Sequence, residues 1–199
     1  MILSETSVGV FQCNLDRLRR GDQDAIGQFV AQYEPFIRRT LRYRIARAAL
    51  QSAADSIDVC QSVLGGFLLR LAAGEYELHT EEDLRKLLMA IANKKFLVLN
   101  RRETAAKRDR RQTRSLEDVD DIPESAKKTT IVDHLELLQE VSKRLKPEEQ
   151  QLFHWRREGQ SWETISDRMS QDALILRKRL SRALHRVAIE LKLEDEGDG

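Results

Sequence analysis

The 199-residue chain is long enough for one domain or two small ones, and 41% hydrophobic residues give it enough apolar material for a core. Charged residues make up 34% of the chain while Gly and Pro are few, which favours a helical protein with a strongly charged surface. The formal net charge is only +1, so composition gives no electrostatic argument for a polyanionic partner, and such an argument depends on where the charges lie.

Cysteine usage and the start of the chain exclude further classes of protein. Cys13 and Cys60 are too few for a disulfide framework and are not spaced as a metal site, so we expect both at core or boundary positions of a cytosolic protein. Residues 1–13 lack a charged start followed by a long apolar run, and no stretch approaches the roughly 18 apolar residues of a membrane span. We therefore expect a cytoplasmic protein that is neither exported nor anchored.

The first predicted helix follows Asp22. Apolar residues recur at three- and four-residue steps from Ile26 to Ile45, which is helical spacing. Pro35 lies within this stretch, lacks an amide hydrogen and brings its ring against the preceding turn. We therefore expect either two helices that meet near Glu34 or one bent helix.

A second helix is predicted to start at Asp55 or Ser56 and to carry a broad apolar face as far as Leu71. Gly65 and Gly66 lie inside it, and each glycine costs about 1 kcal/mol in a helix interior. The pair indicates either close packing, with another segment approaching the backbone, or a weak spot that is tolerated. The sequence leaves both interpretations open.

A third helix is predicted to start near Asp83, and its apolar pattern ends at Leu99. Its continuation to Arg114 is strongly basic, and a run of this kind is usually a solvated helix face. Taken alone, the run fits that account about as well as it fits contact with a polyanion. The following segment, residues 115–129, is acidic, contains Pro123 and has no helical period, so we expect a flexible linker.

After the linker, a helical stripe runs from Ile131 to Leu145. Pro147 and the glutamates after it suit a helix start, since proline fits a first turn and acidic residues favour the positive end of a helix. We expect this next helix to end around Gly159.

A short helix, a tight turn and a longer helix follow, which is the helix-turn-helix pattern of DNA-binding proteins. Ser161 is placed to cap the short helix, and Asp172 to cap the longer one. One side of the longer helix is an apolar core stripe that runs from Ala173 to Leu191. The other side and its edges carry the residues that we expect to contact DNA: Leu174, Arg177, Lys178, Ser181, Arg182 and His185.

Such a face suits the major groove, where Arg and Lys can donate to guanine and a small or apolar side chain can touch a thymine methyl group. A basic helix chosen at random is more often an ordinary solvated surface helix. Here the preceding short helix, the turn and the cap at Asp172 favour DNA binding.

Taken together, these segments resemble an extracytoplasmic-function sigma factor, the two-domain minimal form of the promoter-specificity subunit of bacterial RNA polymerase in the sigma-70 superfamily. Residues 145–191 are similar to the family's region four, which begins with Leu-x-Pro-Glu-Glu and closes with an Arg-Leu-Ser-Arg-Ala helix. Residues 55–71 are similar to the region-two helix with its Asp-Val-x-Gln core. The matching residues are Asp58, Val59, Gln61, Leu145, Pro147, Glu148, Glu149, Arg179, Leu180, Ser181, Arg182 and Ala183.

The resemblance implies an all-α fold of two small helical domains joined by the acidic linker, residues 115–129. Residues 1–114 would form a region-two-like domain that docks on core RNA polymerase and binds the promoter's minus-ten element. Residues 130–199 would form a region-four-like helix-turn-helix domain that binds the minus-thirty-five element.

The resemblance also implies roles for residues of the first domain. Those implied to bind polymerase are Asp58, Gln61 and Ser62. By the same analogy, aromatic rings in the loop before the third helix help to trap an unstacked base of the minus-ten element, and the basic helix holds the strand. The implied minus-ten residues are Tyr76, His79, Asn93, Lys94, Lys95, Arg101 and Arg102.

The chain departs from the family's usual pattern at Ser62, Lys94 and Ser170, where an acidic residue, an asparagine and a glycine are common. The implied partners are core RNA polymerase and promoter DNA, together with an anti-sigma protein, which is common in the family. The resemblance implies no catalytic activity, cofactor or metal.

Other classes of function stay open beside this one. A stand-alone helix-turn-helix regulator needs the C-terminal segment but not the region-two residues. An enzyme has little support, because the four histidines are scattered and no catalytic motif accompanies them. A helical scaffold with solvated basic faces would show no salt-dependent affinity for DNA.

Overall fold

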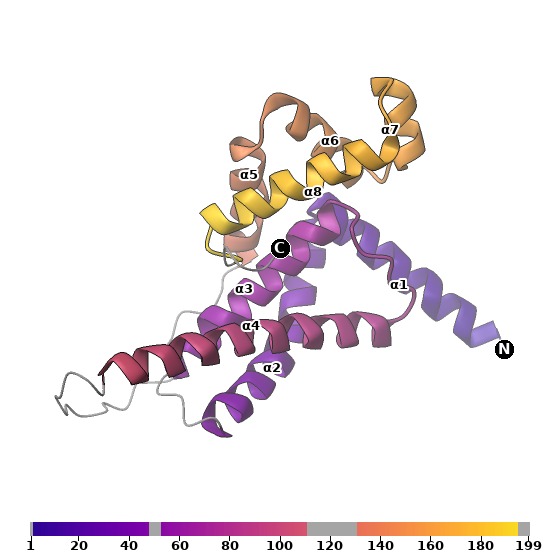
Figure 1. Cartoon of the computed structure of the whole chain (residues 1–199). Coiled ribbons are helices and arrows are strands. Elements are labelled where there is room, and N and C mark those ends of the chain that lie inside the picture. The colour runs from indigo at the N-terminus through magenta and orange to yellow at the C-terminus, as the bar shows by residue number, and fades with distance from the viewer. Residues whose placement is uncertain (1, 48–52, 111–130, 195–199) are drawn as a thin grey trace.

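The computed structural model describes residues 2–47, 53–110 and 131–194, and every regular element in these ranges is an α-helix (Figure 1). The predicted all-α fold class is therefore confirmed, while the predicted linker, residues 115–129, lies outside the described ranges. The helices are α1 (Ile2–Arg20), α2 (Gln23–Arg47), α3 (Ala53–Ala72), α4 (Glu81–Arg110), α5 (Ile131–Arg144), α6 (Pro147–Arg157), α7 (Trp162–Met169) and α8 (Ala173–Glu190).

Helix α1 lies before the first predicted element. Its Leu15 and Leu18 are buried, and the helix packs against α2 and α3. Gly21, at a φ of 80°, turns the chain, a left-handed conformation that glycine adopts without steric strain. Asp22 then caps α2, because its Oδ1 accepts a hydrogen bond from the backbone N–H of Ala25 at 2.9 Å.

Helix α2 continues through Pro35 as one helix, so the alternative of two helices meeting near Glu34 is wrong. A proline inside a helix costs about 3 kcal/mol through a lost hydrogen bond and a steric clash. Beyond it, however, Ile37, Leu41 and Ile45 are buried. Burying each such side chain contributes about 1.5–3 kcal/mol, so the apolar stripe outweighs the proline.

Helix α3 is the centre of the molecule and contacts α1, α2, α4, α5, α6 and α8. A Cβ atom on Gly65 would lie 3.1 Å from the Cδ2 atoms of both Leu137 and Leu193, whereas a Cβ on Gly66 would have nothing within 4 Å. Close packing therefore explains the first glycine of the pair but not the second.

The two cysteines lie in different environments. Cys60 is buried in α3, as expected of a core residue, and burial raises the pKa of its thiol to about 12. Cys13 is exposed on α1, so the prediction of a core or boundary position is wrong for this residue.

Helix α4 begins at Glu81, close to the predicted start at Asp83. The N–H of Thr80 donates to Asp83 Oδ2 at 3.0 Å, and the N–H of Asp83 donates to Thr80 Oγ1 at 3.1 Å. This reciprocal pair satisfies two amide hydrogens that the helix cannot satisfy itself.

In the second part of the chain, α6 begins at Pro147 as predicted and ends at Arg157, shortly before Gly159. The carboxylate of Glu149 accepts from the N–H of Lys146 at 2.9 Å at the start of this helix. The predicted core stripe of α8 is confirmed in its centre, where the buried residues are Leu176, Leu180, Ala183, Leu184, Val187 and Ala188.

The N-terminal half, α1–α4, and the C-terminal half, α5–α8, pack on each other. Helix α5 contacts α2 and α3, while α6 and α8 contact α3. Figure 1 shows the C-terminal helices lying over one end of α3, with α4 projecting away from them. Buried side chains of both halves belong to one continuous hydrophobic cluster.

Candidate nucleic-acid interface

The segment from α7 to α8 has a defined local geometry. The Ser161 side chain accepts from the N–H of Thr164 at 3.2 Å and so caps α7. Asp172 Oδ1 accepts from the N–H groups of Leu174, at 2.8 Å, and Ile175, at 3.2 Å. Both caps expected from the sequence are therefore present, and the first turn of α8 is held in place.

The turn between α7 and α8 contains a residue in a left-handed conformation. Ser170 has a φ of 50° and a ψ of 39°, a conformation that costs a residue with a side chain about 1–2 kcal/mol. The hydroxyl of Ser166 donates to the carbonyl of Gln171 at 2.6 Å and ties the turn to α7. The sigma-factor family that the sequence resembles commonly has glycine at this position.

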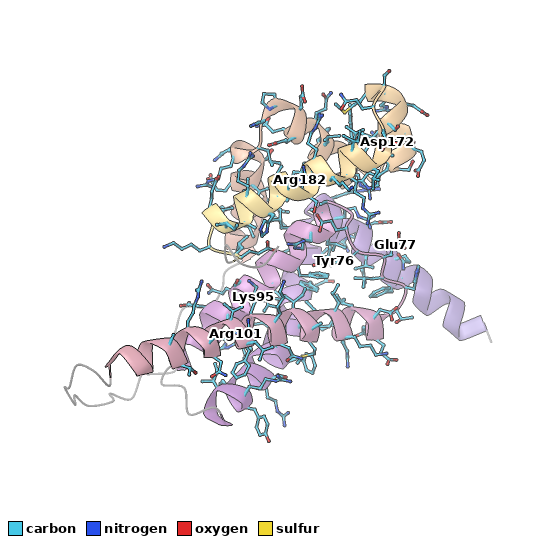
Figure 2. The ribbon with its side chains drawn as sticks, viewed as in Figure 1. Tyr76, Glu77, Lys95, Arg101, Asp172 and Arg182 are labelled. Carbon is cyan, nitrogen blue, oxygen red and sulfur yellow. The ribbon has the colours of Figure 1, made fainter. Side chains whose placement is uncertain are left out.

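One face of α8 points to solvent. Leu174 is 57% exposed and Ile175 56% exposed, and Lys178 and Arg182 are exposed beside them. Ile175, Lys178 and Arg182 line a shallow hollow on this face. Figure 2 shows Asp172 at the start of α8 and Arg182 further along it. We call Leu174, Ile175, Lys178 and Arg182 the outward face of α8.

Other arginines of α8 have acidic partners on α6. Arg179 Nη1 lies 3.0 Å from Glu148 Oε2, and Arg186 Nη2 lies 2.8 Å from Glu149 Oε2. Within the part of the chain that the structure describes, Lys178 and Arg182 take part in no ion pair. Arg177 is exposed as well and takes part in no ion pair in the described ranges, so the positive charge of α8 that is open to a partner extends from the outward face to Arg177.

The remaining DNA-binding candidates of α8 lie off the outward face, and of these Arg177 is exposed. Arg177 and Ser181 line a cavity of about 140 Å³ together with Gly74 and Glu75. His185 Nδ1 lies 2.7 Å from Glu194 Oε2, in the segment that follows α8. The structure thus separates the six predicted residues, since only Leu174, Lys178 and Arg182 share the outward face.

The predicted polymerase-binding residues lie along α3. Asp58 is exposed and Gln61 is half-buried. The hydroxyl of Ser62 donates to the backbone carbonyl of Leu193 at 2.8 Å, so the end of the C-terminal half covers this position.

Tyr76 and His79, expected to trap a base together, have different surroundings. The ring of Tyr76 stacks on Phe67 with centroids 5.6 Å apart, and burial raises the pKa of its hydroxyl to about 12. His79 is exposed and lines a pocket of about 500 Å³. The structure therefore does not bring the two side chains to one surface.

The pocket beside His79 is formed mainly by helices α1 and α2. Its lining includes Phe11 and Leu15 from α1 and Phe29 and Tyr33 from α2. Sequence reasoning missed this pocket because it did not predict α1. The three- and four-residue spacing of Phe11, Leu15 and Leu18 is the signal that would have indicated that helix.

The predicted minus-ten residues of α4 fall on two of its faces. Lys94 and Arg101 are exposed and seven residues apart, so they lie on one face, and Lys95 and Arg102 lie on another by the same spacing. Lys95 Nζ donates to the carbonyl of Leu193, and Arg102 is exposed. Figure 2 shows Lys95 and Arg101 at separate points along α4.

Asn93, the remaining predicted minus-ten residue, is half-buried, and its Oδ1 is buried without a hydrogen-bond partner among the described residues. No group of three or more His, Cys, Asp or Glu side chains in the described ranges could hold a metal ion. None of the described helices is long and apolar enough to cross a membrane.

No protein-family model, curated protein or solved structure matches this chain.

Proposed function

We propose that this chain is a sigma factor of the extracytoplasmic-function type, which binds core RNA polymerase and directs it to specific promoters. In this proposal α1–α4 act as the region-two-like domain, α5–α8 act as the region-four-like domain, and α7 and α8 form its helix-turn-helix. The observation that carries the proposal is the outward face of α8, exposed just beyond the capped start of that helix.

The chemistry of the outward face suits duplex DNA. Lys178 and Arg182 are exposed and have no acidic partner in the described ranges, so they are available to guanine O6 and N7 or to phosphates. Leu174, at 57% exposure, leaves apolar area in water that a thymine methyl group would cover. The face therefore combines donors with an apolar contact, as readout of a major groove requires.

Two features of the N-terminal half support the polymerase and minus-ten contacts. Asp58 is exposed on α3 at the position of the region-two core motif. Lys94 and Arg101 are exposed on one face of α4, where successive phosphates of a strand can be contacted. The exposure of these side chains is consistent with a domain that docks on polymerase and holds a DNA strand.

In vitro transcription with purified core polymerase tests the proposal. Over a library of promoters, we expect transcripts that start at defined sites only when the chain is added. Arg182→Ala should reduce them, and Arg144→Ala on α5 is a matched control that removes an exposed, ion-paired arginine from another helix. If core polymerase initiates equally well without the chain on every template, the proposal is wrong.

A stand-alone DNA-binding regulator is the second candidate, since α7 and α8 alone would serve that function. Binding to core polymerase separates the two candidates. Asp58→Arg should weaken binding to core polymerase and leave duplex DNA binding through α8 unchanged. A chain that binds promoter DNA tightly but never core polymerase would be a regulator.

A further inference from the structure

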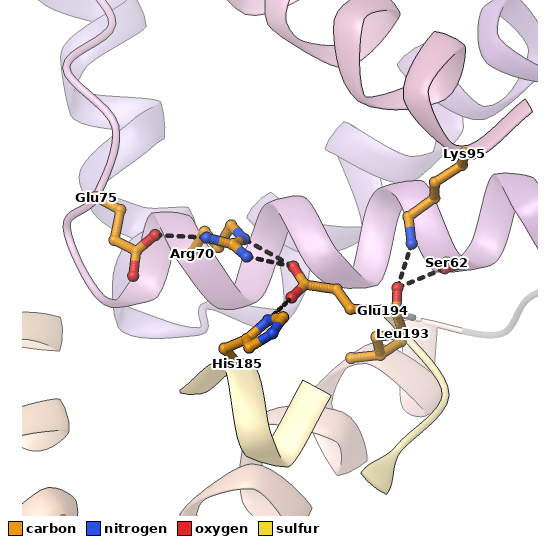
Figure 3. Close-up of polar contacts among 7 residues, drawn as sticks. All are labelled: Ser62, Arg70, Glu75, Lys95, His185, Leu193 and Glu194. Atoms are coloured by element: carbon orange, nitrogen blue, oxygen red, sulfur yellow. Dashed lines mark hydrogen bonds and ion pairs between the residues drawn. The ribbon is translucent and has the colours of Figure 1, made fainter. Parts of the chain in front are cut away.

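The chain turns back onto α3 immediately after α8. Lys192, at a φ of 58°, redirects the backbone, and the carbonyl of the next residue is bonded by side chains of both α3 and α4. The carbonyl of Leu193 accepts from the hydroxyl of Ser62 at 2.8 Å and from Nζ of Lys95 (Figure 3). This one backbone oxygen therefore accepts hydrogen bonds both from Ser62, a proposed polymerase-binding residue, and from Lys95, a proposed minus-ten residue.

Glu194 fixes this segment with charge-assisted hydrogen bonds. Its Oε1 accepts from Arg70 of α3 at 2.5 Å and 2.9 Å, and its Oε2 lies 2.7 Å from His185 Nδ1 of α8 (Figure 3). Arg70 also donates to Glu75 at 2.9 Å. Burial raises the pKa of Glu194, but the bonds from His185 and Arg70 outweigh burial, so its pKa is lowered and it stays ionised.

An apolar contact supports these bonds. Leu193 packs on α3 at Gly65, where a Cβ atom would lie only 3.1 Å from Leu193 Cδ2 and equally close to Leu137 of α5. The missing side chain at this position lets the C-terminal half approach the backbone of α3. We call Leu193 and Glu194, with the contacts they make, the latch.

Two arginines of α6 hold the opposite end of the interface. Arg156 donates to the carbonyls of Ala73 and Gly74, both at 3.2 Å, at the C-terminal end of α3. Arg157 donates to the carbonyl of Arg20 at 2.5 Å, at the end of α1. Helix C-termini carry unsatisfied carbonyls and partial negative charge, so guanidinium groups are favourable there.

We propose that this arrangement is an autoinhibited closed state, in which the latch keeps the chain from binding polymerase until the two halves separate. The proposal rests on the proposed function, because it needs α3 to be the polymerase-binding helix. In the closed state Ser62 is covered by Leu193, Ser181 lines the cavity beside Gly74 and Glu75, and His185 is paired with Glu194 of the latch. A partner that contacts Ser62 or Ser181 must therefore displace the other half, and one that contacts His185 must break the latch.

The first test measures the closed state without reference to function. Spin labels on Glu82→Cys of α4 and Gln151→Cys of α6, in a Cys13→Ser background, report the distance between the halves, since both positions are exposed. We expect a single narrow distribution for this chain. Adding Glu194→Arg, which places a cation against Arg70 and His185, should broaden it and shift it to longer distances.

A chain that ends at Lys192 is the second variant, because it removes the latch together with residues 195–199 and places no cation beside Arg70. It should open in the same way as Glu194→Arg. Glu190→Arg, one turn earlier on exposed α8 surface, makes the same charge change outside the latch and should leave the distribution narrow. Equal distributions for the parent, both latch variants and the control would overturn the closed state.

The second test measures affinity for core polymerase. Only the open fraction of the chain binds polymerase, so the apparent affinity is the intrinsic affinity multiplied by that fraction. Opening should therefore tighten binding by about tenfold in both latch variants and not in Glu190→Arg. Variants that open without binding more tightly would overturn the inhibition while the proposed function stands. If open variants and parent all fail to bind polymerase, the proposed function fails, and the inhibition fails with it.

Discussion

The arginines of α8 differ in what each one touches. Arg179 and Arg186 lie against Glu148 and Glu149 of α6, so much of their charge is compensated within the C-terminal half. Arg182 is exposed beside Lys178 on the outward face. Residue type does not separate these three arginines, and only the contacts distinguish a structural arginine from one that is available to a ligand.

Arg182→Ala should therefore weaken recognition of one upstream promoter element by about 1–3 kcal/mol, if the guanidinium contacts a base edge. Binding of the full chain to duplexes that differ at single base pairs measures this loss, with Arg144→Ala as the control. An equal loss on every duplex would instead identify Arg182 as a phosphate contact.

At the scale of a helix, local hydrogen bonds determine how α8 is presented. Asp172 satisfies the N–H groups of Leu174 and Ile175, which carry the apolar part of the outward face. Without this cap the first turn would have free amide hydrogens, and the side chains at its surface would lose their fixed positions. The cap therefore links helix stability to the outward face.

We expect Asp172→Ala to lower the free energy of unfolding by about 0.5–2 kcal/mol, because the cap is lost. Urea denaturation followed by circular dichroism measures it. Asp167→Ala on α7 is the control, since Asp167 is exposed and caps no helix. Similar losses in both variants would show that the cap contributes nothing beyond the removal of an aspartate.

The adjacent glycines of α3 give a second test at this scale. Gly66→Ala has open space for its methyl group and should raise the free energy of unfolding by about 0.5–1 kcal/mol through helix propensity. Gly65→Ala would place its Cβ 3.1 Å from both Leu137 and Leu193, so it should gain less or destabilise. Parallel urea titrations compare the two. A larger gain for Gly65→Ala would contradict the close packing.

Across the whole molecule, sequence predicted the helices better than their arrangement. The core stripe of α8, the caps at Ser161 and Asp172 and the start of α6 at Pro147 all followed from side-chain periodicity and capping chemistry. The contacts between the two halves could not be predicted in this way, because their hydrogen-bond acceptors are often backbone carbonyls, such as those of Ala73, Gly74 and Leu193. Every residue has a backbone carbonyl, so the sequence does not indicate which carbonyls accept hydrogen bonds in an interface.

Acid should open the two halves, because Glu194 is an ionised group that joins them. Its pKa in the closed state is lowered from an ordinary value of 4.5, so the closed state binds fewer protons than the open one. The contribution of Glu194 to the stability of the closed state is therefore fully present above about pH 4.5 and is lost as the pH falls through the lowered pKa of Glu194. The other carboxyls in the described ranges with lowered pKa values, Asp22, Asp83, Glu140 and Glu163, have the groups that lower them within their own half and do not favour closure.

The spin-label distance between Glu82→Cys and Gln151→Cys, recorded from pH 7 down to pH 3.5, measures this opening. Glu194→Gln is the control, because its side chain keeps its size and cannot titrate. In the parent chain the long-distance population should rise at acid pH, whereas Glu194→Gln should already show it at pH 7 and change less. If both chains open to the same extent at acid pH, another group is responsible for the opening, and Glu194 does not control closure by its titration.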